Sequence, residues 1–170
     1  MFLLLLCIFH PTCHLEIHEQ HGYQRLHHLP GILLGESQRL LTLEDVKKVA
    51  EPLAALLIEL PQREIGGQLP AWEDLTALTD RARERGIVLH LDGARLWECQ
   101  PFYGREYRKI AALFDTVYVS FYKILGGIAG AVLAAPRWRQ PRPTLPLRAL
   151  CLTKHVNLVK VTMKSLPIFN

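Results

Sequence analysis

Two side chains with complementary chemistry stand just beyond predicted strands of this sequence. Asp92 follows the apolar residues 87–91, and Lys123 lies three positions after residues 116–120. In a parallel sheet the carboxyl ends of neighbouring strands meet at one edge, so we expect the carboxylate and the amine to face one crevice. A surface aspartate and a surface lysine without a common role fit the same spacing, so the pair alone leaves both interpretations open.

One cofactor needs such a pair of groups. Pyridoxal 5′-phosphate (PLP) is anchored by a lysine amine through a Schiff base, and a carboxylate against its pyridine nitrogen keeps that nitrogen protonated. The protonated ring then accepts the electron pair of a carbanion. The spacing of Asp92 and Lys123 therefore raises PLP chemistry as a hypothesis.

Segments typical of strands and helices alternate along the chain, which is the order expected of parallel strands joined by helices. Apolar stretches predict strands at residues 53–60, 87–91, 116–120 and 129–135. Apolar residues at helical spacing predict helices at residues 43–50, 71–85 and 106–113. The predicted fold class is α/β with a mostly parallel sheet, and Glu59, Asp92 and Lys123 stand at its strand ends.

The N-terminal residues 2–9 are apolar and could be taken for the core of a secretion signal. No Lys or Arg precedes them, no small-residue cleavage site follows, and eight residues are too few to cross a bilayer. We therefore expect a buried strand. The four cysteines are scattered and form no CxxC pair, which favours a reducing compartment and a cytoplasmic location.

Charge is distributed unevenly along the 170 residues. Residues 1–136 hold 13 Lys and Arg and all 16 Asp and Glu, a net charge of −3, whereas residues 137–170 hold 7 Lys and Arg and no acid, a net charge of +7. Nucleic-acid binding would need a basic face on the folded part, so this class of partner is disfavoured. We expect residues 1–136 to form the folded domain and residues 137–170 to be a poorly ordered basic tail.

The residues around Asp92 and Lys123 resemble two motifs of a known family. HLDGARLWE at residues 90–98 and SFYKILGG at residues 120–127 are similar to segments of the threonine aldolase and aromatic amino acid β-eliminating lyase family. HLEIHE at residues 14–19 resembles the family's His-x4-Glu segment, and Glu59 followed by Gly66-Gly67 resembles its Glu-Asn-Thr-His…Gly-Gly loop. The resemblance covers residues 8–135. It implies part of a PLP-binding large domain with the aspartate-aminotransferase-like fold (fold type I).

The resemblance also implies a role for each matching residue. Lys123 would form the Schiff base, Asp92 would contact the pyridine nitrogen, and His14 would stack on the PLP ring. Arg95 would lie near the ring oxygen and the substrate carboxylate, for which a planar, permanently charged guanidinium is suited. Ser120, which begins the second motif, joins them as a cofactor-binding residue. The implied reaction is Cα–Cβ cleavage of β-hydroxy or aromatic amino acids, with Lys123, His14 and Asp92 as catalytic residues.

The sequence departs from the family's pattern in its loops and its length. Gln62 corresponds to the family's loop histidine, and a glutamine cannot act as a general base near neutral pH. Ile124 stands where a glycine is usual. The Gly-Thr phosphate-binding segment and the small C-terminal domain have no counterpart, and full-length members are homo-oligomers. We therefore expect a fragment that is weakly active or inactive.

Three alternatives to this interpretation stay open. The chain could be another PLP-dependent amino acid enzyme, such as a transaminase-like one, or a truncated product without enzymatic activity. Six histidines also crowd residues 10–28, and His14 and His18 have the spacing of two ligands on one helix face. Glu16 does not directly follow a histidine as an HExxH zinc site requires, so we predict no metal site.

Overall fold

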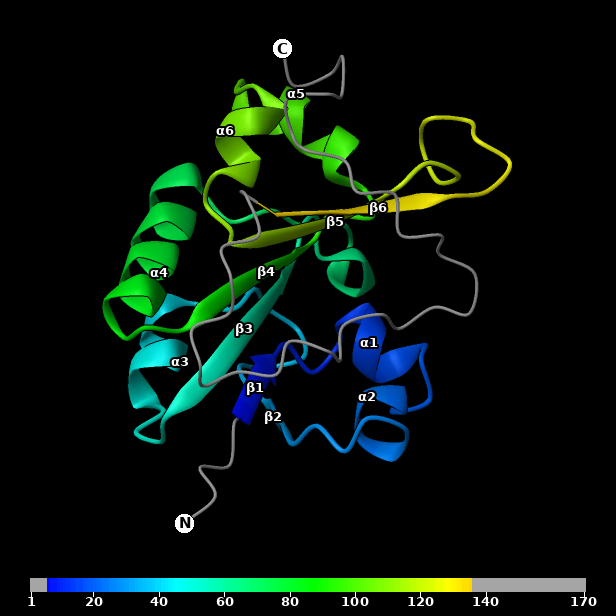
Figure 1. Cartoon of the computed structure of the whole chain (residues 1–170). Helices are drawn as coiled ribbons and strands as arrows, with labels where there is room; N and C mark the ends of the chain where they lie inside the picture. Colours follow the sequence, from blue (N-terminus) through cyan, green and yellow to red (C-terminus); the bar gives the residue numbers. More distant parts are fainter. Residues whose placement is uncertain (1–5, 136–170) are drawn as a thin grey trace.

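A single sheet has the strand order β2-β1-β3-β4-β5-β6 (Figure 1). The computed structural model describes residues 6–135. Strands β1 to β5 are parallel, and β6 lies antiparallel to β5 at the edge. The strands are β1 (Leu6–Phe9), β2 (Gly31–Leu33), β3 (Leu53–Glu59), β4 (Val88–Asp92), β5 (Thr116–Ser120) and β6 (Ala131–Ala134). The predicted α/β class with a mostly parallel sheet is confirmed.

The three predicted helices are present with slightly shorter bounds, as α3 (Leu43–Lys48), α4 (Trp72–Glu84) and α6 (Tyr107–Ala111). The short elements are not predicted from the sequence, because they are too brief to show a periodicity. They are α1 (His14–Ile17), α2 (Gly22–Arg25), β2, the 3₁₀ turns η1 (Arg63–Ile65) and η2 (Leu96–Glu98), and α5 (Cys99–Tyr103).

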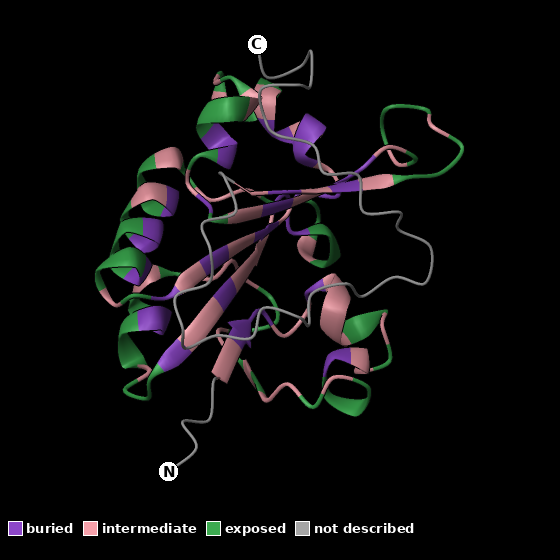
Figure 2. Ribbon diagram, viewed as in Figure 1, coloured by how far each residue is buried: buried purple, intermediate pink, exposed green. Residues whose placement is uncertain are grey.

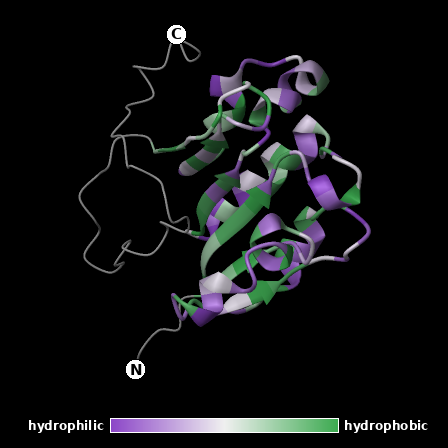
Figure 3. Ribbon diagram, turned by 90° about the vertical axis from the view of Figure 1, so that its right-hand side faces the viewer, coloured by the Kyte–Doolittle hydropathy of each residue, from purple (hydrophilic) through white to green (hydrophobic). Residues whose placement is uncertain are grey.

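Helices cover the two faces of the sheet unequally (Figure 1). α3, α4 and α6 pack on one face, where Val46, Leu78 and Ile110 join the strand residues Leu56 and Leu89 in the main core. α1 and α2 lie on the other face, over a small cluster of Phe9, Cys13 and Tyr23. Figure 2 shows the buried positions along the strands and inner helix faces, and Figure 3 shows hydrophobic residues following the strands.

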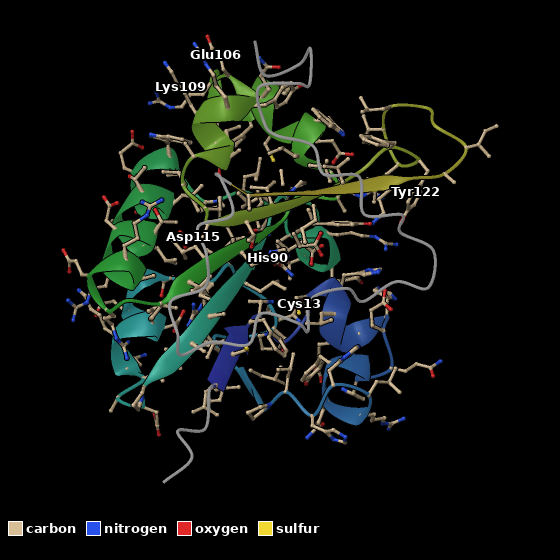
Figure 4. The ribbon with its side chains drawn as sticks, viewed as in Figure 1. Cys13, His90, Glu106, Lys109, Asp115 and Tyr122 are labelled. Carbon is tan, nitrogen blue, oxygen red and sulfur yellow. The ribbon has the colours of Figure 1, made fainter. Side chains whose placement is uncertain are left out.

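Alternation along the central strands places polar residues on the face that carries α1. Leu89 and Leu91 are fully buried toward the main core, so His90 and Asp92 point to the opposite face. Figure 4 shows His90 near the middle of the sheet. The register of β3 and β4 puts Glu59 directly beside Asp92, at the carboxyl ends of both strands. The polar side chains thus gather at the edge where an α/β sheet binds its ligand.

The described residues 6–135 leave two predictions without a test. Leu6–Phe9 form the buried strand expected at the N-terminus, but residues 2–5 lie outside the described part. The basic tail at residues 137–170 lies outside it entirely. Within the described part, the helices are too short and too polar to cross a membrane.

Candidate functional site

A narrow pocket lies at the carboxyl ends of β3 and β4. Four of the five predicted site residues line it, although they come from three separate stretches of the chain. The full lining is His14, Glu59, Leu60, Pro61, Arg63, Asp92, Ala94, Arg95 and Lys123. The fold therefore brings together an amine, two carboxylates, two guanidinium groups and an imidazole.

The turn after β4 fixes the carboxylate of Asp92. Its Oδ1 accepts a hydrogen bond from the Ala94 N–H at 3.2 Å. Gly93 makes this turn possible, because a Cβ there would lie 2.8 Å from the carbonyl oxygen of Tyr118 on the neighbouring strand. The motif's glycine thus allows the backbone of β4 to approach β5 closely where both strands reach the pocket.

Ser120 is absent from the lining of the pocket. It is fully buried, and its hydroxyl donates a hydrogen bond to the Ala94 carbonyl at 2.8 Å. The indole N–H of Trp97 lies 3.4 Å from the Ser120 carbonyl. Ser120 therefore ties the end of β5 to the turn that carries Asp92 and Arg95. Its predicted contact with a cofactor stays a prediction.

Lys123 lies in the loop that joins β5 to β6. The Phe121 carbonyl accepts the Gly127 N–H at 2.9 Å, which closes the loop just beyond the lysine. Ile124, Leu125 and Ile128 are 42%, 49% and 103% exposed, so the apolar side chains that follow the lysine are uncovered. Figure 4 shows Tyr122, the residue before the lysine, on the opposite side of the molecule from Lys109 on α6.

One N–H donor of Arg95 has no hydrogen-bond partner among the described residues. Its Nη1 donates to Glu98 Oε1 at 3.0 Å. Its Nε is buried and has no hydrogen-bond partner among residues 6–135. A buried donor without a partner costs free energy, and at a pocket wall a ligand acceptor can supply that partner.

His14 is the first residue of α1, and Cys13 precedes it as the N-cap. The His14 Nε2 donates to Glu19 Oε1 at 3.1 Å, and its ring centroid lies 4.9 Å from that of His18. His18 donates in turn to Glu64 at 2.9 Å. Burial raises the pKa of the Cys13 thiol to about 12, so this cysteine stays protonated and is a poor nucleophile.

Glu59 was named as a strand-end candidate but not as a site residue. Its Oε2 accepts the backbone N–H of His14 at 3.0 Å. Burial, together with the neighbouring charge of Asp92, raises the pKa of Glu59 to about 7. Two carboxylates at adjacent strand ends could have been foreseen from the sequence, because both follow apolar runs.

The loop after β3 holds one residue that the sequence analysis missed. Arg63 lines the pocket, and only its position between Pro61 and Gly66-Gly67 could have drawn attention to it. Gln62, which the resemblance places at the family's loop histidine, is 4% exposed and outside the lining. Its amide nitrogen donates to the Thr12 carbonyl at 3.2 Å.

Comparison with known proteins agrees with this architecture. The family model described as beta-eliminating lyase matches residues 3–161. A Listeria monocytogenes structure, of a protein proposed to be an L-allo-threonine aldolase, is 57% identical and superposes with a TM-score of 0.73 over 75% of this chain. A structure from Exiguobacterium sp. 255-15, proposed to be an aromatic amino acid beta-eliminating lyase or threonine aldolase, is 55% identical with a TM-score of 0.74 over 77%.

A curated relative is similar to this chain over a shorter segment. The aldolase vrtJ of Penicillium aethiopicum is 38% identical over 82 residues, which make up 48% of this chain and 20% of that protein. The matched part spans 36% of the Listeria structure and 37% of the Exiguobacterium structure. The chain therefore corresponds to little more than a third of these solved proteins.

Proposed function

This chain belongs to the beta-eliminating lyase family, and we propose that its pocket is the cofactor end of a PLP-dependent lyase. The proposed reaction is cleavage of the Cα–Cβ bond of β-hydroxy amino acids, which yields an aldehyde and glycine. One observation carries the proposal. Lys123, Asp92, Arg95 and His14 come from three separate segments and line one pocket.

The groups in the pocket suit PLP chemically. A primary amine can bond to its aldehyde carbon, and a carboxylate can accept from its protonated ring nitrogen. The buried Arg95 Nε lacks a partner among the described residues and would gain an acceptor from the ring oxygen or the substrate carboxylate. The imidazole of His14 offers a flat face for stacking.

In this proposal each side chain has a separate task. Asp92, oriented by the Ala94 N–H, would hold a proton at the ring nitrogen. Lys123 would anchor the cofactor, and Arg95 would orient the substrate carboxylate. His14 would cover the ring and keep water from it. When bound, PLP would supply the electron sink that makes Cα–Cβ cleavage possible.

Covalent trapping tests the anchor. We expect borohydride reduction of the chain mixed with PLP to leave an adduct on the peptide that contains Lys123, and Lys123→Ala to abolish it, because only a primary amine forms the bond. Lys109→Ala is the matched control, since Lys109 is an exposed lysine on α6, away from the pocket. Mass spectrometry that finds the adduct on Lys109 instead would refute the assignment.

A different PLP-dependent amino acid reaction is the second candidate, and Gln62 favours it. The amide at the position of the family's loop histidine is buried and bonded to Thr12, so it offers no base to a substrate hydroxyl. Threonine, phenylserine and alanine, supplied separately with PLP, discriminate the two. Aldehyde release from either hydroxy amino acid supports aldol cleavage, whereas racemisation or amino transfer with alanine supports the second candidate.

We also propose that the full-length protein works as a cytoplasmic homo-oligomer, with no nucleic-acid or membrane partner. The net charge of −3 on residues 1–136 and the scattered cysteines support this setting. Size-exclusion chromatography of the longer protein with light scattering tests the oligomeric state.

A further inference from the structure

One carboxylate joins two loops at the wall of the pocket. Glu59 Oε2 accepts the N–H of His14 at 3.0 Å, and Oε1 accepts the N–H of Arg63 at 3.4 Å. His14 begins α1 and Arg63 begins η1, so neither N–H has an acceptor within its own helix. Glu59 supplies both acceptors from the end of β3, a strand fixed in the middle of the sheet.

We propose that Glu59 is a positioning residue, whose carboxylate clamps the His14 loop (residues 10–17) to the Arg63 loop (residues 61–67) and so sets where the imidazole lies in the pocket. The part of this assignment that concerns the cofactor rests on the proposed function, because the imidazole would cover the PLP ring. The clamp itself depends only on contacts within this chain.

The charge around Glu59 indicates a role beyond folding. Asp92 on β4 opposes its ionisation, while Lys123 favours it; Arg63 and Arg95 also line the pocket. With burial as the main cause, the pKa of Glu59 rises from the usual 4.5 to about 7. The folded state therefore loses stability as the pH rises from about 4.5 to about 7. This carboxyl group thus costs stability near neutral pH, which is a common property of residues that serve function.

Ionisation also changes the strength of the clamp. A carboxylate offers acceptors on both oxygens, whereas a protonated carboxyl carries a hydrogen on one of them. The bonds to His14 and Arg63 should therefore strengthen as the pH rises through about 7. Gln62 links the same loops through Thr12 with an amide that does not titrate. The two links can be told apart by their pH dependence.

Amide hydrogen exchange measures the clamp without any cofactor. In the wild-type chain we expect the protection of the His14 and Arg63 amides, corrected for intrinsic rates, to rise between about pH 6 and about pH 8. Glu59→Gln should lower that protection about tenfold at the higher pH and remove its pH dependence. Gln62→Ala should lower protection and leave the pH dependence intact. Glu44→Gln, whose exposed carboxylate on α3 pairs with Lys47, should change neither amide.

Several outcomes decide the proposal. Protection that stays flat with pH in the wild-type chain, or that is unaltered in Glu59→Gln, overturns the clamp. If Glu59→Gln does not fold, the wild-type pH series still decides, and Glu59→Asp should keep a pH dependence with weaker protection. A loosened clamp with unchanged PLP affinity overturns the positioning role. No adduct on Lys123 in a wild-type chain with an intact clamp defeats the proposed function but leaves the clamp standing.

Discussion

At the scale of single residues, the pair Glu59 and Asp92 dominates the electrostatics of the pocket. The two residues are register partners on β3 and β4, so their carboxyl groups lie next to each other at the strand ends. Burial and this second negative charge together raise the pKa of Glu59 to about 7. Glu59 therefore binds a proton more readily than an exposed glutamate does.

Asp92→Asn should lower the pKa of Glu59 from about 7, because the substitution removes the neighbouring negative charge. The fall should be partial, since burial is the larger cause and remains. NMR titration of the Glu59 side-chain carboxyl measures the shift.

The Asp92→Asn variant should also retain the borohydride-stable PLP adduct on Lys123, but it should exchange the Cα proton of glycine about a hundredfold more slowly.

Glu64→Gln is the matched control for this titration, because Glu64 is not among the groups that shift Glu59. An unaltered Glu59 titration in Asp92→Asn would contradict the side-by-side arrangement. An unaltered rate of Cα proton exchange would instead mean that Asp92 only forms the turn after its strand.

At the scale of elements, a network of hydrogen bonds caps the N-terminus of α3, the helix that precedes β3. Thr42 and Asp45 form a capping box, and Asp45 also receives two hydrogen bonds from Arg39, at 2.6 and 2.9 Å. These bonds hold the pKa of the nearly buried Asp45 carboxyl well below its usual range. The loop before α3 is further fixed by His10, whose Nε2 lies 2.8 Å from the Arg39 carbonyl.

Asp45→Asn should reduce the free energy of unfolding by about 1–2 kcal/mol at neutral pH. Because the folded-state pKa is depressed, this stability is present above the unfolded pKa of about 4 and is lost as the pH falls below it. Urea denaturation at about pH 7 and about pH 3 measures the difference, which should shrink at the lower pH. Glu44→Gln is the control, since that exposed carboxylate pairs only with Lys47. An equal difference at both pH values would disprove the ion-pair explanation.

At the scale of the whole molecule, the sheet fixes one wall of the pocket, whereas the loop that carries Lys123 has exposed apolar side chains. β3, β4 and β5 hold the carboxylates and the turn of Asp92, whereas Ile124, Leu125 and Ile128, in the loop that carries Lys123, are exposed. The matched part spans 36% of the Listeria structure. The proposed cleavage of a Cα–Cβ bond needs that bond held in line with the ring's π system, so loose binding would reduce rate as well as affinity.

The purified chain of residues 1–170 should therefore be a poor catalyst by itself. With PLP and either threonine or phenylserine, we expect turnover well below about 1 per second, the lower end for ordinary enzymes. Coupled detection of the released aldehyde measures the rate. A rate at or above that value from a monomer would show that the residues present already form a complete site.

The sequence alone indicated the α/β class, the longer strands and helices, and four of the residues that line the pocket. Periodicity was sufficient for α3, α4 and α6, because apolar residues at helical spacing are near neighbours in the chain. Four of the five predicted site residues line the pocket because their motifs sit at strand ends, and parallel pairing brings such ends together.

Only the tertiary structure decided what those residues contact. The bond from His14 to Glu59 joins positions 45 residues apart, and no local pattern encodes which N–H a distant carboxylate will meet. The same holds for the burial of Ser120 and Gln62, for the Arg95 Nε that lacks a partner among residues 6–135, and for the shifted pKa of Glu59. Burial and the proximity of charges exist only after the sheet has formed, so the sequence could name the groups but not their environment.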